Sequence, residues 1–326
     1  MTVNRLTTPA PKRLKSAVRV LVTVTLLALA ISFVDLDTLA DDLRDVGWAW
    51  LGVAVALVGV IILFEARQFA QVALAFGHDV GALQFLRMSL VGRFFALLTP
   101  AMLGNDIYRA MAMHSLGTGG RRSVSLAAIS RIVSLMALGP VMVAGLPFIA
   151  RYTWGTAEFW LFAVVVGLTV LTCFLLLHPA GAHLLAGTRW RALREVAHEA
   201  TQLRFVALQA SVRFRLWVYA VLQHVIRVFA VMAVAKAYGV TADWTVFFGF
   251  VPVSLLIAMI PVSIGSWGVR EIALVFSLGS AGVAAGPALL TSVSFGLLGM
   301  LFALCGGLIW MTGIGTPPPR IGSEKP

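Results

Sequence analysis

Two segments share the pattern Pro-x-x-x-Gly-[Asn/Ser]-x-x-x-Arg, whose residue types are suited to holding an anion. Proline stops an incoming helix, and glycine permits a tight turn and a close approach of the backbone to a ligand. A polar N-cap can then start a second helix, whose N-terminus attracts negative charge. An arginine in the next turns offers paired donors that match a phosphate. The two copies consist of Pro100, Gly104, Asn105 and Arg109, and of Pro261, Gly265, Ser266 and Arg270.

Every position of the second copy lies 161 residues after its counterpart. For either copy alone, chance or a simple kink would be the better explanation. Two copies at equal spacing favour a functional element, with Asn105 and Ser266 predicted as N-caps. An arginine at bilayer depth costs roughly 2.5–3.5 kcal/mol, so such residues are functional or paired. The structural alternative is a local ion pair, Arg109 with Asp106 or Arg270 with Glu271.

Further charged residues interrupt the apolar segments. Arg131 and Arg227 are predicted to join the same cavity, and Arg93 is a weaker candidate that could instead extend to the interface. Glu65, together with Arg67 and Lys236, is expected near a span end at the membrane interface. The predicted site comprises Gly104, Asn105, Asp106, Arg109, Arg131, Arg227, Gly265, Ser266, Arg270 and Glu271, with helix breaks at Pro100, Pro261 and Gly268.

The composition is that of a membrane protein. Of 326 residues, 60% are hydrophobic and only 12% are charged, against about 25% charged in soluble domains. The net charge of +11 would suggest nucleic acid as a partner of a soluble protein. Here the charges lie in short segments between apolar runs, which is typical of the positive-inside rule. No nucleic-acid partner, metal or cofactor is therefore predicted, and no nucleophile–base set is visible.

The predicted fold is all-α and polytopic, with one transmembrane domain over 17–313 between a basic cytoplasmic tail, 1–16, and a disordered tail, 314–326. A cleaved signal peptide is the alternative for the first apolar run, but the many later spans favour an uncleaved span. The predicted helices cover 17–34, 46–66, 80–98, 105–114, 123–150, 157–177, 215–239, 245–262, 267–279 and 286–313, and an amphipathic connection covers 178–214.

Charge placement distinguishes two topologies. With both termini in the cytoplasm, the acidic first loop falls outside, as the positive-inside rule prefers. Eight simple crossings would leave Arg121, Arg122 and the basic segment 178–214 outside. Six full spans plus two re-entrant hairpins of opposite orientation keep them inside. We therefore predict about eight membrane segments in two inverted repeats, roughly 17–150 and 157–313, with broken helices aimed at a midplane site.

The chain resembles the lysylphosphatidylglycerol synthase transmembrane-domain family, also described as flippase-like, over nearly its whole length. The resemblance rests on Glu65-Ala-Arg67 and on the stretches 98–110 and 260–271, of which the last is the most specific. It implies a membrane domain that moves a charged lipid, and some stand-alone relatives are linked to polyprenyl-phosphate sugars. This chain lacks the soluble synthase domain of the larger relatives, so lysyl transfer is not implied.

A second departure from the family concerns the fourth apolar segment. The family often has a Glu-Arg pair there, followed by an Asp. In this chain Ser130 precedes Arg131 and Ser134 occupies the position of the acid. We therefore expect Arg131 to lack its usual local acidic partners, which would make the cavity more positive and favour an anionic headgroup.

These features predict a flippase of the cell membrane that moves an anionic lipid between leaflets, either a phospholipid or a polyprenyl-phosphate-linked sugar. The alternatives are an intramembrane lipid-modifying transferase, with Asp106, Glu271 and Glu65 as the available acids, or a non-catalytic subunit of a lipid-modifying complex. Membrane lipids are the expected partners. A homo-oligomer and a lipid-synthesis partner both stay open.

Overall fold

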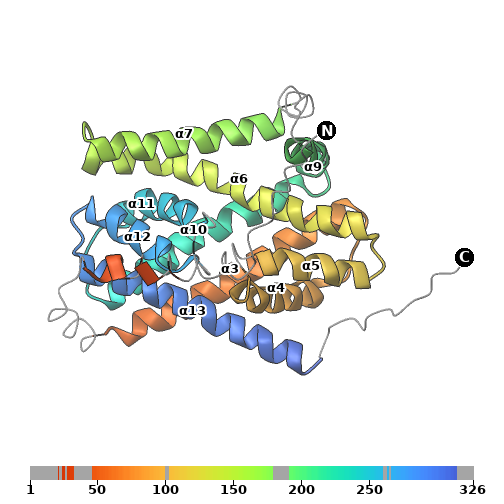
Figure 1. Ribbon diagram of the computed structural model, residues 1–326, viewed down its shortest axis with the longest axis horizontal. Coiled ribbons are helices and arrows are strands. Elements are labelled where there is room, and N and C mark those ends of the chain that lie inside the picture. Colours follow the sequence, from red (N-terminus) through yellow and green to blue (C-terminus); the bar gives the residue numbers. More distant parts are fainter. Residues whose placement is uncertain are drawn as a thin grey trace, which may run out of the picture.

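The computed structural model describes residues 21, 24–25, 28–32, 46–99, 103–178, 191–259, 263 and 266–313, and it is helical with no strand in these ranges (Figure 1). This confirms the predicted all-α fold. The helices are α3 (Trp48–Ala75), α4 (Ala82–Leu97), α5 (Leu103–Ser115), α6 (Gly120–Thr153), α7 (Ala157–Leu177), α9 (Arg191–Leu208), α10 (Arg213–Ala237), α11 (Trp244–Ile257), α12 (Val269–Gly279) and α13 (Ala285–Met311).

Five of these helices, α3, α6, α7, α10 and α13, are long and apolar enough to cross a membrane. The shortest of them has 21 residues, and about 20 apolar residues span the hydrocarbon core. The chain is therefore a multi-pass membrane protein, as predicted. Both predicted tails, most of the first span and the motif residues Pro100, Pro261 and Gly265 lie outside the described residues.

The two motif regions each contain a pair of short helices. Helix α4 has 16 residues and α5 has 13, while α11 has 14 and α12 has 11. Each is shorter than a bilayer requires, and the members of each pair pack against one another. In Figure 1 the pair α4–α5 and the pair α11–α12 lie toward opposite ends of the bundle. These pairings favour re-entrant hairpins over simple crossings.

The spacing of 161 residues extends beyond the motif. Shifted by that amount, α3, α4 and α6 fall on α10, α11 and α13 to within a few residues at each end. The contacts between helices show the same correspondence. Helix α4 contacts α13 as its equivalent α11 contacts α6, and α3 contacts α4 as α10 contacts α11. The largest packing interface joins the two equivalent helices α3 and α10, which run side by side through the bundle. This internal correspondence supports the predicted repeats.

One pair of glycines shows the correspondence at atomic detail. Gly145 of α6 faces the backbone of α11, and a Cβ added there would lie 2.7 Å from the carbonyl oxygen of Phe248. Gly306, which lies 161 residues later, faces the backbone of α4, and its Cβ would lie 2.0 Å from the carbonyl oxygen of Leu90. Both positions need glycine because each spanning helix touches the backbone of the other repeat's hairpin.

Basic segments gather at one end of the bundle. Arg122, near the start of α6, donates to the carbonyl oxygen of Phe76 at the end of α3 (3.0 Å). Ser125, one turn further along α6, donates to Glu199 of α9 (2.8 Å). The pair at 121–122 and the connecting helix α9 therefore share one end, as the two-hairpin topology predicts. The side of the membrane on which this end lies stays a prediction from charge.

The boundaries of one helix correct the sequence analysis. Helix α3 continues to Ala75, well beyond the predicted end at 66, because apolar residues continue through Phe69, Val72 and Ala73, which are buried. Glu65 therefore lies in the interior of a spanning helix. Its predicted interfacial position is wrong.

Candidate functional site

A cavity of about 300 Å³ lies between the two hairpins and the helices α3, α6, α10 and α13. Of the predicted site residues, the structure brings seven to its wall: Asn105, Asp106, Arg109, Arg131, Arg227, Ser266 and Arg270. Glu65, Gln68, Arg93 and Gln223 line it as well. A volume at the lower end of the range for small-molecule sites suits a headgroup rather than a whole lipid.

Arg109 is held by polar and aromatic contacts instead of a carboxylate. Its side chain is 5% exposed, donates to the Ser89 hydroxyl (2.9 Å), and lies over the ring of Phe69 at 4.9 Å. Among the described residues, no carboxylate lies within ion-pair distance of it. Its Nε atom is buried without a hydrogen-bond partner in the described chain. The predicted alternative, an ion pair with Asp106, is wrong.

Glu65 joins both repeats through two arginines. One carboxylate oxygen accepts from Arg93 of α4 (2.6 Å) and the other accepts from Arg227 of α10 (2.8 Å). Arg227 also donates to Nδ1 of His224 (3.1 Å), whose Nε2 faces the carbonyl oxygen of Ser134 (2.8 Å). A ring that accepts at Nδ1 and donates at Nε2 is neutral. The pair of arginines therefore shares a single negative charge.

Arg131 has an acidic partner from another helix. Its guanidinium lies 2.6 Å from the carboxylate of Asp106 on α5. Arg131 lacks acidic partners in its own helix, as expected, but the packing of α5 against α6 supplies one across 25 residues of sequence. The absence of an acid at Ser134 in its own helix is thus compensated by the hairpin.

Arg270 is clamped within the second hairpin. It pairs with Glu271 through Nε (3.0 Å) and Nη2 (2.5 Å), and it stacks over Trp267 at 4.7 Å. A Cβ added at Gly296 of α13 would lie 2.1 Å from Nη2, so the guanidinium rests against that helix. Glu271 is fully buried behind it and also accepts from the backbone N–H of Gly268 (2.6 Å). The predicted local pairing describes this arginine correctly.

The predicted N-cap roles are wrong. Asn105 lies two residues inside α5, which begins at Leu103, and its Oδ1 is buried without a partner among the described residues. Ser266 precedes the start of α12, whose N-cap is Gly268. Ser266 and Gly268 both have positive φ, at 65° and 86°. The turn before α12 is therefore capped by the carboxylate of Glu271 and not by a serine hydroxyl.

Gly104 allows the start of α5 to lie close against the end of α4. A Cβ there would lie 2.1 Å from the carbonyl oxygen of Phe95, and its N–H donates to the Thr99 hydroxyl (2.6 Å). The glycine thus lets α5 start directly against the end of α4. It does not line the cavity.

The remaining wall of the cavity is apolar. Side chains from α3, α4, α6, α11 and α13 and from the connection between α11 and α12 form it, and α13 contributes small residues beside Phe295 and Met300. The arginines and these apolar side chains together make the cavity amphipathic. The apolar members are Val58, Ile61, Ala96, Leu97, Leu135, Leu255, Ala258, Met259, Trp267, Phe295, Gly296, Gly299, Met300 and Ala303.

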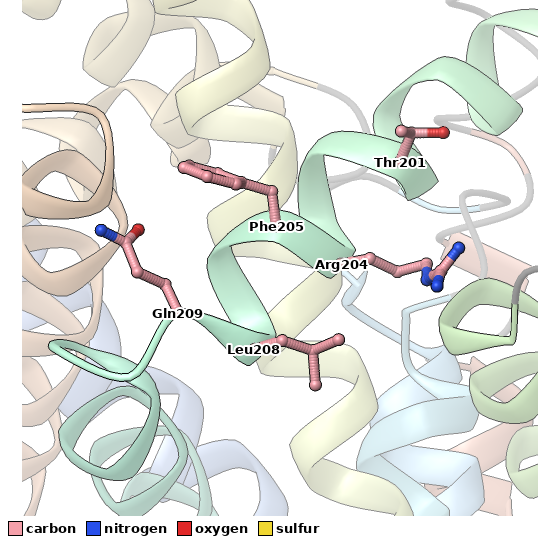
Figure 2. A pocket seen from close by; sticks show the side chains of 5 residues that line it. All are labelled: Thr201, Arg204, Phe205, Leu208 and Gln209. Carbon is pink, nitrogen blue, oxygen red and sulfur yellow. The ribbon is translucent and has the colours of Figure 1, made fainter.

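A second hollow lies on α9, and charged side chains from different helices do not converge on it. It is shallow and is lined by Thr201, Arg204, Phe205, Leu208 and Gln209. Figure 2 shows Thr201, Arg204 and Leu208 pointing to one side and Phe205 and Gln209 to the other, so the five side chains do not converge. We assign no chemistry to it.

The fold and the cavity define a polytopic helical membrane protein with an arginine-lined, amphipathic chamber between two broken segments. Residues 16–307 match the family described as lysylphosphatidylglycerol synthase TM region, and the chain belongs to this family. The resemblance seen in the sequence is thereby confirmed, and the family indicates a function related to membrane lipids. A comparison with curated proteins finds no match.

Proposed function

We propose that the protein is a flippase that moves an anionic lipid between the two leaflets of the cell membrane. The observation that carries this proposal is the convergence of five arginines, from both hairpins and from α6 and α10, on one cavity that is also lined by apolar side chains. Arginine matches phosphate geometry and keeps its charge when buried. An apolar wall suits the beginning of the lipid tails.

Transport requires that the cavity opens alternately to each leaflet. The two hairpins are equivalent elements toward opposite ends of the bundle (Figure 1), and each packs against a spanning helix of the other repeat. In transporters with inverted repeats, such elements move against one another around a central site. Opening of the α4–α5 pair would expose the headgroup to one leaflet, and opening of the α11–α12 pair would expose it to the other.

Reconstitution in liposomes tests the proposal. Fluorescent phosphatidylglycerol, phosphatidate and a polyprenyl phosphate are incorporated, and the fraction accessible to an impermeant quencher is followed with time. We expect protein-dependent exchange of at least one anionic lipid, lost in Arg109→Ala and Arg270→Ala but kept in Arg151→Ala, whose arginine is exposed at the end of α6. If all three lipids exchange no faster with the protein than in protein-free liposomes, the flippase proposal is refuted. Unchanged exchange in both cavity variants would refute the assignment of the binding site.

A transferase is less well supported by the cavity. The three acids that it could use as a base, Glu65, Asp106 and Glu271, each form an ion pair with arginine. A carboxylate held by arginine is a weak proton acceptor. Formation of a modified lipid by the purified protein from a donor and an acceptor would favour the transferase, and stable co-purification of a lipid-modifying enzyme would favour the non-catalytic subunit.

A further inference from the structure

The charges at the cavity do not balance. Five arginines line it, namely Arg93, Arg109, Arg131, Arg227 and Arg270. Within the described chain, two carboxylates line it and a third, Glu271, lies behind Arg270. Two positive charges therefore remain uncompensated in a region where desolvation makes unpaired charge expensive.

The excess charge lies on one side of the cavity. The pairs Arg131–Asp106 and Arg270–Glu271 are each neutral. Arg109 has no carboxylate partner among the described residues, and Arg93 and Arg227 share Glu65. Arg109 lies within electrostatic reach of Glu65, Asp106 and Arg93. The two unmatched charges are thus concentrated around α3, α4 and α5.

The charged residues at the cavity are not repeated between the two halves of the chain. At the positions 161 residues away, Arg93 is replaced by Ser254 and Arg131 by Ser292. Glu65 is replaced by Ile226, also an uncharged residue. Only the motif arginine is shared, and in the second repeat Glu271 neutralises it. The repeats correspond in backbone but differ in their charged side chains, since Arg227 and Glu271 of the second repeat correspond to Ala66 and Ala110 of the first.

Two further residues of the lining, on α6 and α10, each have a buried polar atom without a hydrogen-bond partner among the described residues. Ser130 and Gln223 line the cavity and are 1% and 0% exposed. The Oγ of Ser130, the Oε1 of Gln223 and the Nε atoms of Arg93 and Arg109 have no hydrogen-bond partner among the described residues. Buried polar groups are normally satisfied. Three of these four can donate to an anion: the serine hydroxyl and both guanidinium groups.

We propose that this side of the cavity takes a phosphate group with two negative charges, a phosphomonoester or a diphosphate, held by Arg109 together with Arg93 and Arg227. The inference rests on the proposed function and narrows its substrate class. A group with charge −2 neutralises both unmatched arginines, whereas a phosphodiester neutralises one. Arg270 acts as a positioning residue, which fixes α12 against α13 and leaves no charge for the ligand. The apolar wall assigns the phosphate to a lipid headgroup.

Binding measurements test the preferred charge of the ligand without depending on transport. Dissociation constants of phosphatidate and phosphatidylglycerol with identical acyl chains are measured for the purified protein in neutral detergent, with phosphatidylcholine as the reference and glycerol 3-phosphate as a soluble competitor. The second ionisation of a phosphomonoester lies near pH 6. We expect phosphatidate to bind at least tenfold more tightly than phosphatidylglycerol at pH 8, with the preference falling toward unity at pH 5.

Three variants test the assignment. Arg109→Gln should lose the preference at pH 8, Arg109→Lys should retain it because the charge is kept, and Arg151→Gln should leave it unchanged. Equal affinities for the two lipids at pH 8, or a tenfold preference that survives in Arg109→Gln, would overturn the inference while leaving the flippase proposal intact. No preference for either anionic lipid over phosphatidylcholine would instead refute the proposed function. Competition by glycerol 3-phosphate at the lipid's own concentrations would assign the same site to a soluble phosphomonoester.

Discussion

The buried pair Arg270–Glu271 permits a prediction of stability. Glu271 is fully buried, and its two oxygens accept from Arg270, from the Ser292 hydroxyl (3.3 Å) and from the N–H of Gly268. Glu271→Gln removes the charge and replaces one acceptor by a donor that faces other donors. Removing one member of a buried ion pair costs about 3–5 kcal/mol because the other charge remains buried without compensation. We expect a loss of that size in the free energy of unfolding.

The assay is reversible unfolding of the purified protein in mixed micelles with increasing SDS, followed by tryptophan fluorescence. Glu158→Gln, in the first turn of α7, is the matched control and should cost at most about 1 kcal/mol, the size of a helix-dipole interaction. The double variant Arg270→Gln with Glu271→Gln should be more stable than Glu271→Gln alone, because no unpaired charge is left. A loss below about 1 kcal/mol for Glu271→Gln, or a double variant as unstable as the sum of the singles, would refute the clamp.

Three further predictions follow from cavity and packing contacts. Gly296→Ala should displace Arg270 and abolish lipid exchange in liposomes, whereas Gly167→Ala, with open space around its position on α7, should not. Gly306→Ala should lower the free energy of unfolding by about 1–3 kcal/mol, the usual cost of overpacking, since its Cβ would meet the α4 backbone; an unchanged value would contradict the close approach. Glu65→Gln should raise the affinity for phosphatidate several-fold while slowing exchange, because a third arginine becomes unmatched; weaker binding would contradict the charge count.

The arrangement of the helices could be predicted from the sequence because apolar length and a repeated motif determine it. The spacing of 161 residues identified the motif copies, and the same spacing aligns α4 with α11 and Gly145 with Gly306. The hairpin pairing followed from the positions of Arg121 and Arg122, which are local charges. Predictions from apolar length, motif spacing and local charge do not require knowing which side chains contact one another.

The partners of the charges could not be predicted in the same way. The ion pair of Arg131 with Asp106 depends on the packing of α5 against α6, and no local spacing encodes it. The predicted interfacial position of Glu65 assumes a helix that ends near residue 66, but the apolar residues that follow extend α3 to Ala75. The N-cap predictions for Asn105 and Ser266 failed because they assumed that each helix starts directly after the polar residue.

The most direct test of the account is an experimental structure of the protein in nanodiscs that contain phosphatidate. We expect a phosphate in the cavity with oxygen atoms about 3 Å from the guanidinium of Arg109, with Arg270 still paired to Glu271 and the acyl chains leaving along the apolar wall. A cavity filled by acyl chain alone, or a phosphate bound only to Arg270 after its separation from Glu271, would contradict it.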